Sequence, residues 1–208
     1  METLSPYLTQ SNAIAAMCGY LLGSVPFGLV LTRLAGMGDI RDIGSGNIGA
    51  TNVLRTGNKF IAFLTLLCDT GKGAAAGLGA VHFLGIEAGL ITGFMAVFGH
   101  NFSVWLKFKG GKGVATTLGI LIASAWMVGV SACAIWLLVA GIFRYSSLAS
   151  LLSLSAAPAI AWWFGRPDVA FMAAGLALLA ILRHHKNIGN LMQGTESKIG
   201  KNLLNKET

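Results

Sequence analysis

Long apolar stretches separated by short polar clusters make up most of this chain. A membrane-spanning helix needs about 20 mostly apolar residues, or as few as about 17. The stretches that fit one such helix each are Asn12–Leu34, Phe60–Phe83, Gly85–Leu106, Ser147–Phe164 and Asp168–Leu182. A further stretch, Gly113–Phe143, is too long for one ordinary span and short for two.

The basic residues decide how the long stretch crosses, because cytoplasmic loops of membrane proteins attract Lys and Arg. If the chain turns near Trp126 and Met127, the spans become 113–126 and 128–143. Only Arg166 then lies opposite the other basic residues, and Lys72 falls within a span. The basic residues that share one side are Arg33, Arg41, Arg55, Lys59, Lys107, Lys109, Lys112, Arg144, Arg183, Lys186, Lys198, Lys201 and Lys206.

We therefore predict an all-α integral membrane protein with seven transmembrane helices, the N-terminus outside and the C-terminus in the cytoplasm. The composition agrees, because 54% of the residues are hydrophobic and 11% are charged, against about 25% charged residues in soluble domains. We expect one polytopic membrane domain over residues 1–208, with a polar cytoplasmic tail at 187–208. The N-terminus has Glu2 and lacks the basic start of a signal peptide.

The net charge of +7 suggests that a site on the basic side binds anions. The first candidate is the segment GSGNIGATNVLR at 44–55, where small residues expose backbone N–H groups that can form a nest for phosphate oxygens. Arg55 could clamp a phosphate with two hydrogen bonds. The alternative is a flexible loop, but a loop would not need so many donors beside an arginine. The expected binding residues here are Ser45, Gly46, Asn47, Thr51, Asn52 and Arg55.

The second candidate is the segment KFKGGKGVATT at 107–117, where a glycine-rich loop runs into a helix start. Free N–H groups and the positive end of the helix dipole favour an anion there, and Lys112 adds a full charge. A positive-inside anchor would explain Lys107 and Lys109 but not the glycines, Gly110, Gly111 and Gly113. Gly113 stands where a nucleotide-binding P-loop has Ser or Thr, so NTP hydrolysis is not expected.

Further polar residues lie at the ends of the predicted helices or within them. Asp69 and Lys72 share one helix face, so they either pair with each other or shape the floor of the site, and Lys72 is counted among the expected phosphate-binding residues. Ser146 is a good N-cap, and Ser147 beside Arg144 suggests ligand contact. Ser146, Ser147 and, further along the chain, Glu196 are counted among the expected phosphate-binding residues. His184 is a possible general base or an interfacial residue, and Glu196 could orient a basic group. His82 and His100 are interpreted as residues without a functional role.

No His, Cys, Asp or Glu grouping has metal-ligand spacing, so we expect no metal. Cys18, Cys68 and Cys133 are isolated in separate apolar spans, which suits packing and gives no disulfide or zinc pattern.

Taken together, these segments resemble the bacterial acyl-phosphate:glycerol-3-phosphate acyltransferases of the PlsY family. The resemblance runs from about residue 19 to 202. Ser103 stands where the family commonly has Pro, and His185 where it commonly has Arg. The segments that carry the resemblance are GSVPFG at 23–28, SGNIGATNVLR at 45–55, DTGKG at 69–73, GHNFSVWLKFKGGKGVAT at 99–116, RYSSLAS at 144–150 and HHKNIGNLMQGTESK at 184–198.

The resemblance implies transfer of a fatty acyl group from acyl phosphate to the 1-hydroxyl of sn-glycerol 3-phosphate. The products would be lysophosphatidate and phosphate, in the first acylation of phospholipid synthesis, and no cofactor is implied. By matching positions, Gly110, Gly111 and Gly113 would lend N–H groups, and the base would be His184 or a phosphate oxygen of the donor. The residues that would bind or orient the phosphates are Ser45, Arg55, Lys112, Ser147, His184 and Asn187, of which Ser45, His184 and Asn187 are the expected catalytic residues.

Two rival functions fit the sequence less well. A transporter or channel for a phosphorylated anion would also gather basic residues on one face, but ionisable residues are nearly absent from the outer half of the membrane. A CDP-alcohol phosphotransferase would need an array of aspartates, and Asp39, Asp42, Asp69 and Asp168 are widely scattered. We expect a multi-pass, monomeric inner-membrane protein that contacts membrane lipid and no nucleic acid, with its active site on the cytoplasmic face.

Overall fold

The computed structural model describes residues 9–200, and this part of the chain is helical without strands. The expectations for Glu2, Lys201 and Lys206 lie outside the described residues. The helices are α1 (Gln10–Ser24), α2 (Phe27–Leu34), α3 (Ala50–Leu54), α4 (Lys59–Leu84), α5 (Ile86–Asn101), α6 (Val114–Ser124), α7 (Trp126–Phe143), α8 (Ser146–Trp163), α9 (Pro167–Arg183) and α10 (His185–Met192), with short 3-10 turns η1 (Ile40–Asp42) and η2 (Val104–Leu106).

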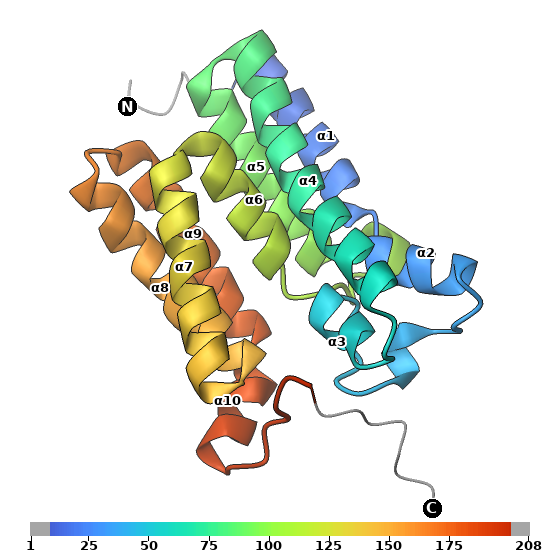
Figure 1. Ribbon diagram of the computed structural model, residues 1–208. Coiled ribbons are helices and arrows are strands. Elements are labelled where there is room, and N and C mark those ends of the chain that lie inside the picture. The colour runs from blue at the N-terminus through green and yellow to red at the C-terminus, as the bar shows by residue number, and fades with distance from the viewer. Residues whose placement is uncertain (1–8, 201–208) are drawn as a thin grey trace, which may run out of the picture.

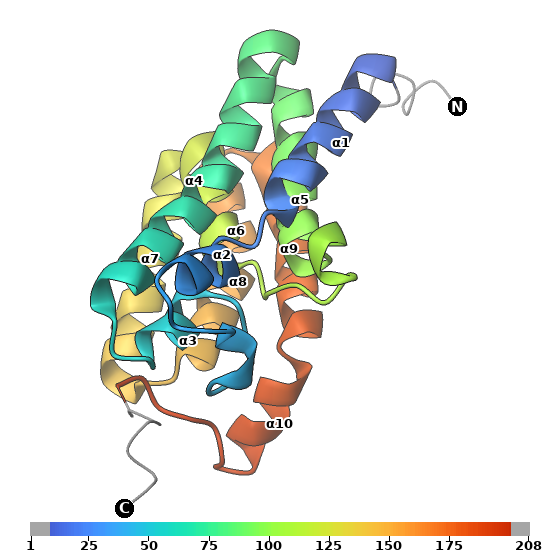
Figure 2. The same ribbon diagram turned by 90° about the vertical axis from the view of Figure 1, so that its right-hand side faces the viewer.

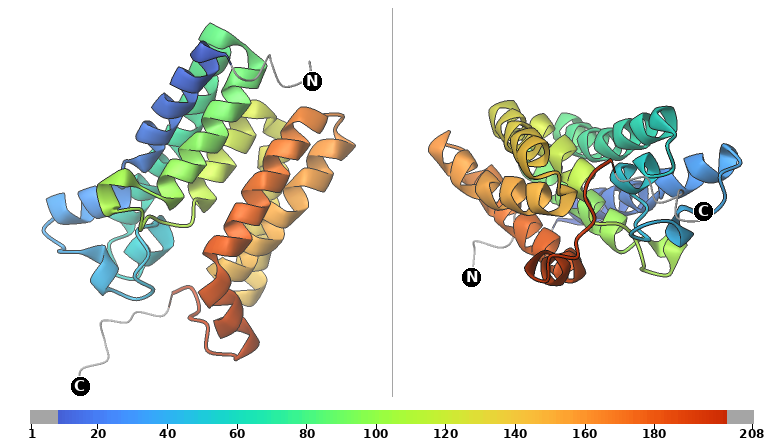
Figure 3. Two further views of the ribbon diagram at one scale, coloured as in Figure 1. Left: turned by 180° about the vertical axis from the view of Figure 1, so that it is seen from behind. Right: turned by 60° about the horizontal axis from the view of Figure 1, so that its bottom comes forward.

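The long helices run side by side along one axis in two groups (Figure 1). Helices α1, α4, α5 and α6 form one group and α7, α8 and α9 the other, with α6 packed against both α4 and α7. Helices α2, α3 and α10 lie at the lower end, as a second view also shows (Figure 2). Because α1 begins at the upper end, the described chain starts and finishes at opposite ends of the bundle (Figure 3).

Several of these helices meet the requirements of a membrane span. Within residues 9–200, four stretches are long and apolar enough: Gln10–Leu34, Lys59–Leu84, Ile86–Leu106 and Trp126–Phe143. Helices α9 and α10 make a fifth if the 62° bend between them belongs to one broken span. The predicted all-helical membrane protein is confirmed. The count of seven spans and the sidedness remain predictions.

Two helix breaks show where the sequence interpretation needed adjustment. The predicted helix over 12–34 is two helices, because Pro26 follows α1 and has no N–H with which to continue the helical hydrogen bonds. The turn predicted near Trp126 and Met127 lies at Ala125, whose extended backbone ends α6 and precedes α7. The long apolar stretch therefore does form two helices.

Small residues let the first group of helices pack closely. A Cβ atom on Gly23 of α1 would overlap the backbone of Ala96 in α5, and a Cβ atom on Gly119 of α6 would overlap the carbonyl of Thr70 in α4. Small side chains at such crossings allow membrane helices to approach one another. The close contact between α4 and α6 matters for function, because both helices line the cavity described below.

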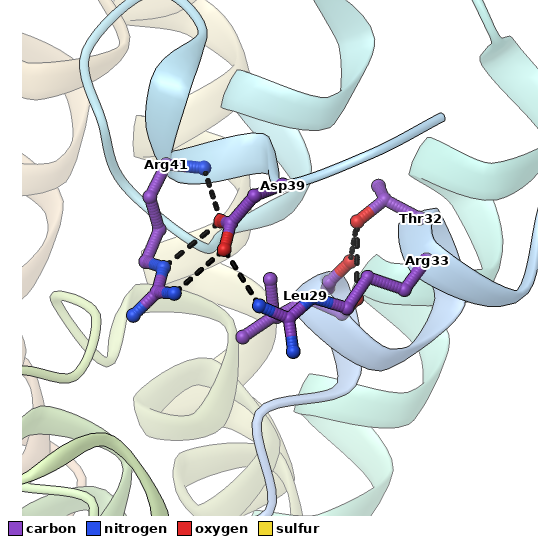
Figure 4. A network of polar contacts seen from close by, with 6 residues as sticks. Leu29, Thr32, Arg33, Asp39 and Arg41 are labelled. Carbon is purple, nitrogen blue, oxygen red and sulfur yellow. Dashed lines mark hydrogen bonds and ion pairs between the residues drawn. The ribbon is translucent and has the colours of Figure 1, made fainter. Parts of the chain in front are cut away.

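A network of charged side chains links α2 to η1 (Figure 4). The carboxylate of Asp39 accepts hydrogen bonds from Arg41, at 2.6 and 2.9 Å, and from Arg33, at 2.7 Å. Arg41, followed by Arg33, holds the pKa of Asp39 well below its usual range. The hydroxyl of Thr32 donates back to the carbonyls of Gly28 and Leu29 within α2. These contacts hold the part of the chain that leads into segment 44–55.

Candidate active site

One cavity of about 530 Å³ brings the polar clusters of the sequence together. Its polar end is built from loops and helix ends, and its apolar part from the first half of α4, from α6 and from the middle of α7. Polar lining residues include Ser45, Asn47, Thr51, Asn52, Arg55, Lys59, Asp69, Thr70, His100, Lys112, Ser146, Ser147, Ser150, His184, Asn187 and Glu196, and Gly113 also lines the cavity. The apolar part includes Phe63, Leu66, Leu118, Ile122, Trp136 and Leu137.

Asn52 shapes the segment 44–55 from within. Its side-chain amide donates to the carbonyls of Ile40, Ile43 and Asn47 at 2.8–3.0 Å. Its Oδ1 accepts hydrogen bonds from the backbone N–H and the hydroxyl of Ser45. Both ends of the Asn52 amide are thus engaged in folding the loop. Asn52 also lines the cavity, and its predicted ligand contact stays a prediction. Gly46 does not line the cavity.

Arg55 brings a largely unneutralised cation to the cavity wall. Its side chain donates to Asn52 Oδ1 at 3.4 Å and to the hydroxyl of Ser197. No carboxylate of the described residues forms an ion pair with it. Burial lowers the pKa of Arg55, against a smaller opposing effect of Glu196, but a guanidinium keeps its proton in proteins. An anionic ligand would supply the missing partner.

Lys112 provides a second cation and is held by a chain of hydrogen bonds. Its Nζ donates to Asn187 Oδ1 at 2.6 Å. The amide of Asn187 donates to Glu196 Oε1 at 2.8 Å, and Ser147 Oγ donates to the same oxygen at 2.6 Å. Glu196 therefore orients Asn187 and, through it, Lys112. Burial lowers the pKa of Lys112 to about 8, with Glu196 acting in the opposite direction.

The glycines before α6 serve close packing more than ligand contact. The N–H of Gly111 donates to the carbonyl of His100 at 2.9 Å, so it is not available to a ligand as predicted. A Cβ atom on Gly110 or Gly111 would overlap His100, and neither glycine lines the cavity. Gly113 does line it, with a positive φ of 75° as it caps α6. Of these three glycines, only Gly113 lines the cavity.

His184 lies at the junction of α9 and α10 and lines the cavity. Its Nδ1 donates to the carbonyl of Ala180 at 2.7 Å, which leaves Nε2 as the nitrogen that can serve a ligand. Across the polar end, the hydroxyls of Thr51 and Ser146 are 3.2 Å apart. The predicted hydroxyl, imidazole and cationic groups therefore surround one space.

Asp69, Lys72 and His100 form a buried cluster beside the cavity. Lys72 Nζ is 2.8 Å from Asp69 Oδ1, so the two residues do pair with each other. Lys72 is absent from the cavity wall, contrary to its predicted phosphate contact, whereas Asp69 and His100 are part of that wall. His100 had been given no functional role. The signal that could have found it is the charge of Asp69 and Lys72 within a span, which demands polar neighbours.

Metal ligands and thiols add little to the site. Among residues 9–200, no three His, Cys, Asp or Glu side chains group closely enough to hold a metal ion. The expectation that the protein uses neither metal nor cofactor stays a prediction. Cys18, Cys68 and Cys133 are free thiols, and Cys133 lines the apolar part of the cavity.

The two departures from the family pattern lie away from the cavity. Ser103 is fully buried, and its hydroxyl donates to the carbonyl of Ser24 at 2.6 Å, which a proline could not do. His185 is exposed on α10, where its Nδ1 donates to the carbonyl of Leu182 at 2.9 Å. Neither change removes a cavity contact.

Comparisons with known proteins agree on one family. The family model described as "Glycerol-3-phosphate acyltransferase" matches residues 13–194. A glycerol-3-phosphate acyltransferase of Rhodospirillum rubrum is 59% identical, over 96% of this chain and 95% of that protein. One of Paramagnetospirillum magneticum is 62% identical, over 89% of this chain and 92% of that protein.

Two solved structures share the fold. The crystal structure of PlsY, an integral membrane glycerol 3-phosphate acyltransferase, in its glycerol 3-phosphate form gives a TM-score of 0.84 at 41% identity. Its lysophosphatidic acid form gives 0.83 at 40% identity. Each alignment covers 91% of this chain and 96% of the other.

Proposed function

The chain belongs to the glycerol-3-phosphate acyltransferase family, and from this premise we propose that it uses acyl phosphate as donor. The acyl group would pass to the 1-hydroxyl of sn-glycerol 3-phosphate and give lysophosphatidate and phosphate. This is the first acylation of phospholipid synthesis. The proposal needs no cofactor.

The observation that supports this proposal is that the polar end and the apolar part belong to one continuous cavity. Arg55 and Lys112 stand at a polar end that continues into an apolar part between α4, α6 and α7. Acyl phosphate and glycerol 3-phosphate both carry phosphate, for which arginine and lysine are suitable partners. Only the donor also carries a long apolar chain, and Phe63, Leu118 and Trp136 offer it an apolar surface.

The chemistry needs no covalent enzyme intermediate, because acyl phosphate is a mixed anhydride with a good leaving group. The hydroxyl oxygen attacks the carbonyl carbon, and a new ester bond forms. The bond between the acyl carbon and the phosphate oxygen breaks, and phosphate leaves with the electron pair. Holding the two substrates together supplies much of the acceleration. Donors such as the second amide N–H of Asn187 and, when it turns away from Asn52, the hydroxyl of Ser45 can stabilise the developing oxyanion.

The hydroxyl proton ends on the released phosphate, either directly or by way of a base. His184 is one base candidate, since Nδ1 is bonded to Ala180 and Nε2 can accept a proton. A phosphate oxygen of the donor is the other, and we favour it because the donor brings its own basic oxygens to the hydroxyl. His184 then orients the acceptor.

We also propose that the polar end faces the cytoplasm of an inner membrane and that the protein works as a monomer. Helices α6 and α8 would complete seven spans, with the N-terminus outside. The supporting observation is that α2, α3 and α10 lie together at one end of the bundle (Figure 1). Of the exposed cations, Arg33 lies in α2, Arg41 in η1 and Lys109 in the loop before α6.

The test is to incubate the purified protein with acyl phosphate and glycerol 3-phosphate and to measure lysophosphatidate and released phosphate in equal amounts. We expect turnover that persists in EDTA and is absent when acyl-CoA replaces acyl phosphate. Equal rates with acyl-CoA would contradict the proposed donor, and a loss of activity in EDTA would contradict the cofactor-free reaction. The variant Lys112→Ala, prepared in the same way, controls for a contaminating acyltransferase.

A further inference from the structure

Three ionisable side chains are buried together between the cavity and α1. Asp69 and Lys72 belong to α4 and are 2% and 4% exposed, and His100 near the end of α5 is 4% exposed. Lys72 Nζ lies 2.8 Å from both Asp69 Oδ1 and His100 Nδ1. Charged groups within a membrane span are costly and mark functional sites more often than packing sites. The cluster therefore needs a role, and Lys72 does not reach the cavity.

The contact between Lys72 and His100 has a definite direction. An ammonium group has only donors, so His100 Nδ1 is the acceptor, and the ring proton sits on Nε2. Lys72 Nζ donates as well to the carbonyl of Val25, at 2.9 Å, beside the break between α1 and α2. These bonds fix the imidazole in one orientation at the end of α5.

His100 in turn supports the loop that carries Lys112. Its carbonyl accepts the N–H of Gly111 at 2.9 Å, and its ring lies so close to Gly111 that no Cβ atom would fit there. From another element, Arg183 donates to the carbonyls of Gly110 and Gly111 at 2.8 and 3.1 Å. The two glycines are thus bonded to His100 and to Arg183, and Lys112 is the next residue along the chain.

We propose that Lys72 and Asp69 are positioning residues that act through His100 on Lys112. Asp69 neutralises and orients the Lys72 ammonium, Lys72 fixes the His100 ring, and His100 fixes Gly111. Lys112 Nζ is then held within reach of Asn187 and of a bound phosphate. The inference rests on the proposed function only in taking Lys112 as a phosphate ligand.

A double-mutant cycle between Lys72 and Lys112 tests this chain of contacts. Binding of sn-glycerol 3-phosphate is measured by calorimetry without any acyl donor, and kcat/KM is measured separately. We expect Lys72→Met to weaken binding and lower kcat/KM by about 10- to 100-fold, the size of effect that a shift of about 1 Å produces. In the Lys112→Met background the same change should have no further effect.

A purely structural role predicts equal losses in both backgrounds, and that result would overturn the inference. Because Lys72→Met leaves Asp69 buried without its partner, the paired variant Asp69→Leu/Lys72→Met repeats the cycle without a lone charge. If both proteins fail to fold, the cluster is structural and the inference is wrong. The control is Thr32→Val, which removes buried hydrogen bonds within α2 and should change thermal stability without changing binding.

The calorimetry also separates this inference from the proposed donor. Wild-type protein that binds glycerol 3-phosphate but does not turn over acyl phosphate would contradict acyl phosphate as the donor. The double-mutant cycle could still be measured by glycerol 3-phosphate binding. Wild-type protein that binds no glycerol 3-phosphate would refute Lys112 as a phosphate ligand, and the inference with it.

Discussion

Lys112 and Asn187, which are 75 positions apart in the sequence, meet at the cavity through a hydrogen bond of 2.6 Å from Nζ to Oδ1. Lys112 comes from the loop before α6, and Asn187 from the first turn of α10. Since Asn187 is itself held by Glu196, the lysine has a fixed direction before any ligand arrives. The ordering cost of binding is reduced by such preorganisation.

Replacing Arg55 or Lys112 should nearly abolish turnover while the protein still folds. Arg55→Ala and Lys112→Ala each remove a charged partner of phosphate, and hydrogen bonds to charged groups contribute about 1.5–3 kcal/mol. We expect kcat/KM to fall by at least about tenfold for each variant. Arg33→Ala is the matched control, because Arg33 is 55% exposed and pairs with Asp39 away from the cavity. A loss of only twofold would make the residue a topological anchor instead.

Substrate affinity should depend on the protonation of Lys112. Its pKa is lowered to about 8 by burial, so the side chain is charged below about pH 8 and neutral above it. A phosphate monoester reaches its dianionic form above about pH 6. The KM for glycerol 3-phosphate should therefore be lowest between these values and rise above pH 8.

The variant Lys112→Arg gives the matching test of the pH dependence. A guanidinium keeps its proton throughout the range, so any rise in KM between pH 8 and 10 should disappear even if the absolute affinity is lower. An unchanged alkaline rise in Lys112→Arg would assign the titration to another group.

The variant His184→Gln distinguishes the two bases. If the donor phosphate takes the proton, turnover should be reduced but measurable, with the pH dependence of a phosphate group. An imidazole base would instead give a rate that falls below its own pKa and vanishes in the variant. Complete loss of turnover, with glycerol 3-phosphate binding intact by calorimetry, would count against proton transfer to the donor.

Topology can be tested by thiol labelling in a background without Cys18, Cys68 and Cys133. An impermeant reagent added outside should reach Met127→Cys but neither Lys109→Cys nor Lys198→Cys, all three of which are exposed positions. Lys109 is preferred to Gly110, where a side chain would overlap His100. Labelling at position 109 from outside would place the cavity on the wrong side of the membrane for this proposal.

The sequence predicted the helices well because long apolar stretches leave few alternatives. The expected span 60–83 corresponds to α4 at Lys59–Leu84, and the long stretch does divide, at Ala125. The requirement that the basic residues share one side of the membrane predicted that division. The length of the apolar stretch alone could not predict it. The break at Pro26 was overlooked because apolar residues continue on both sides of it.

The site could be predicted only as a set of clusters, since contacts between distant segments leave no local pattern. Arg55, Lys112 and His184 do line one cavity. The packing of Gly111 on His100 and the use of Asn52 within its own loop could not be read from residue types. Glycine and asparagine suit a ligand nest and a tight turn equally well.

The apolar part of the cavity is open rather than enclosed, and Phe63, Leu66 and Leu137, which line it, are 58%, 46% and 66% exposed. A lipid-soluble substrate would thus enter from the bilayer, and a lipid product would return to it without crossing water. The relevant concentration is then the mole fraction in the membrane plane. Adding inert lipid at constant total donor should slow the enzyme by surface dilution, even though nothing in the bulk solution has changed.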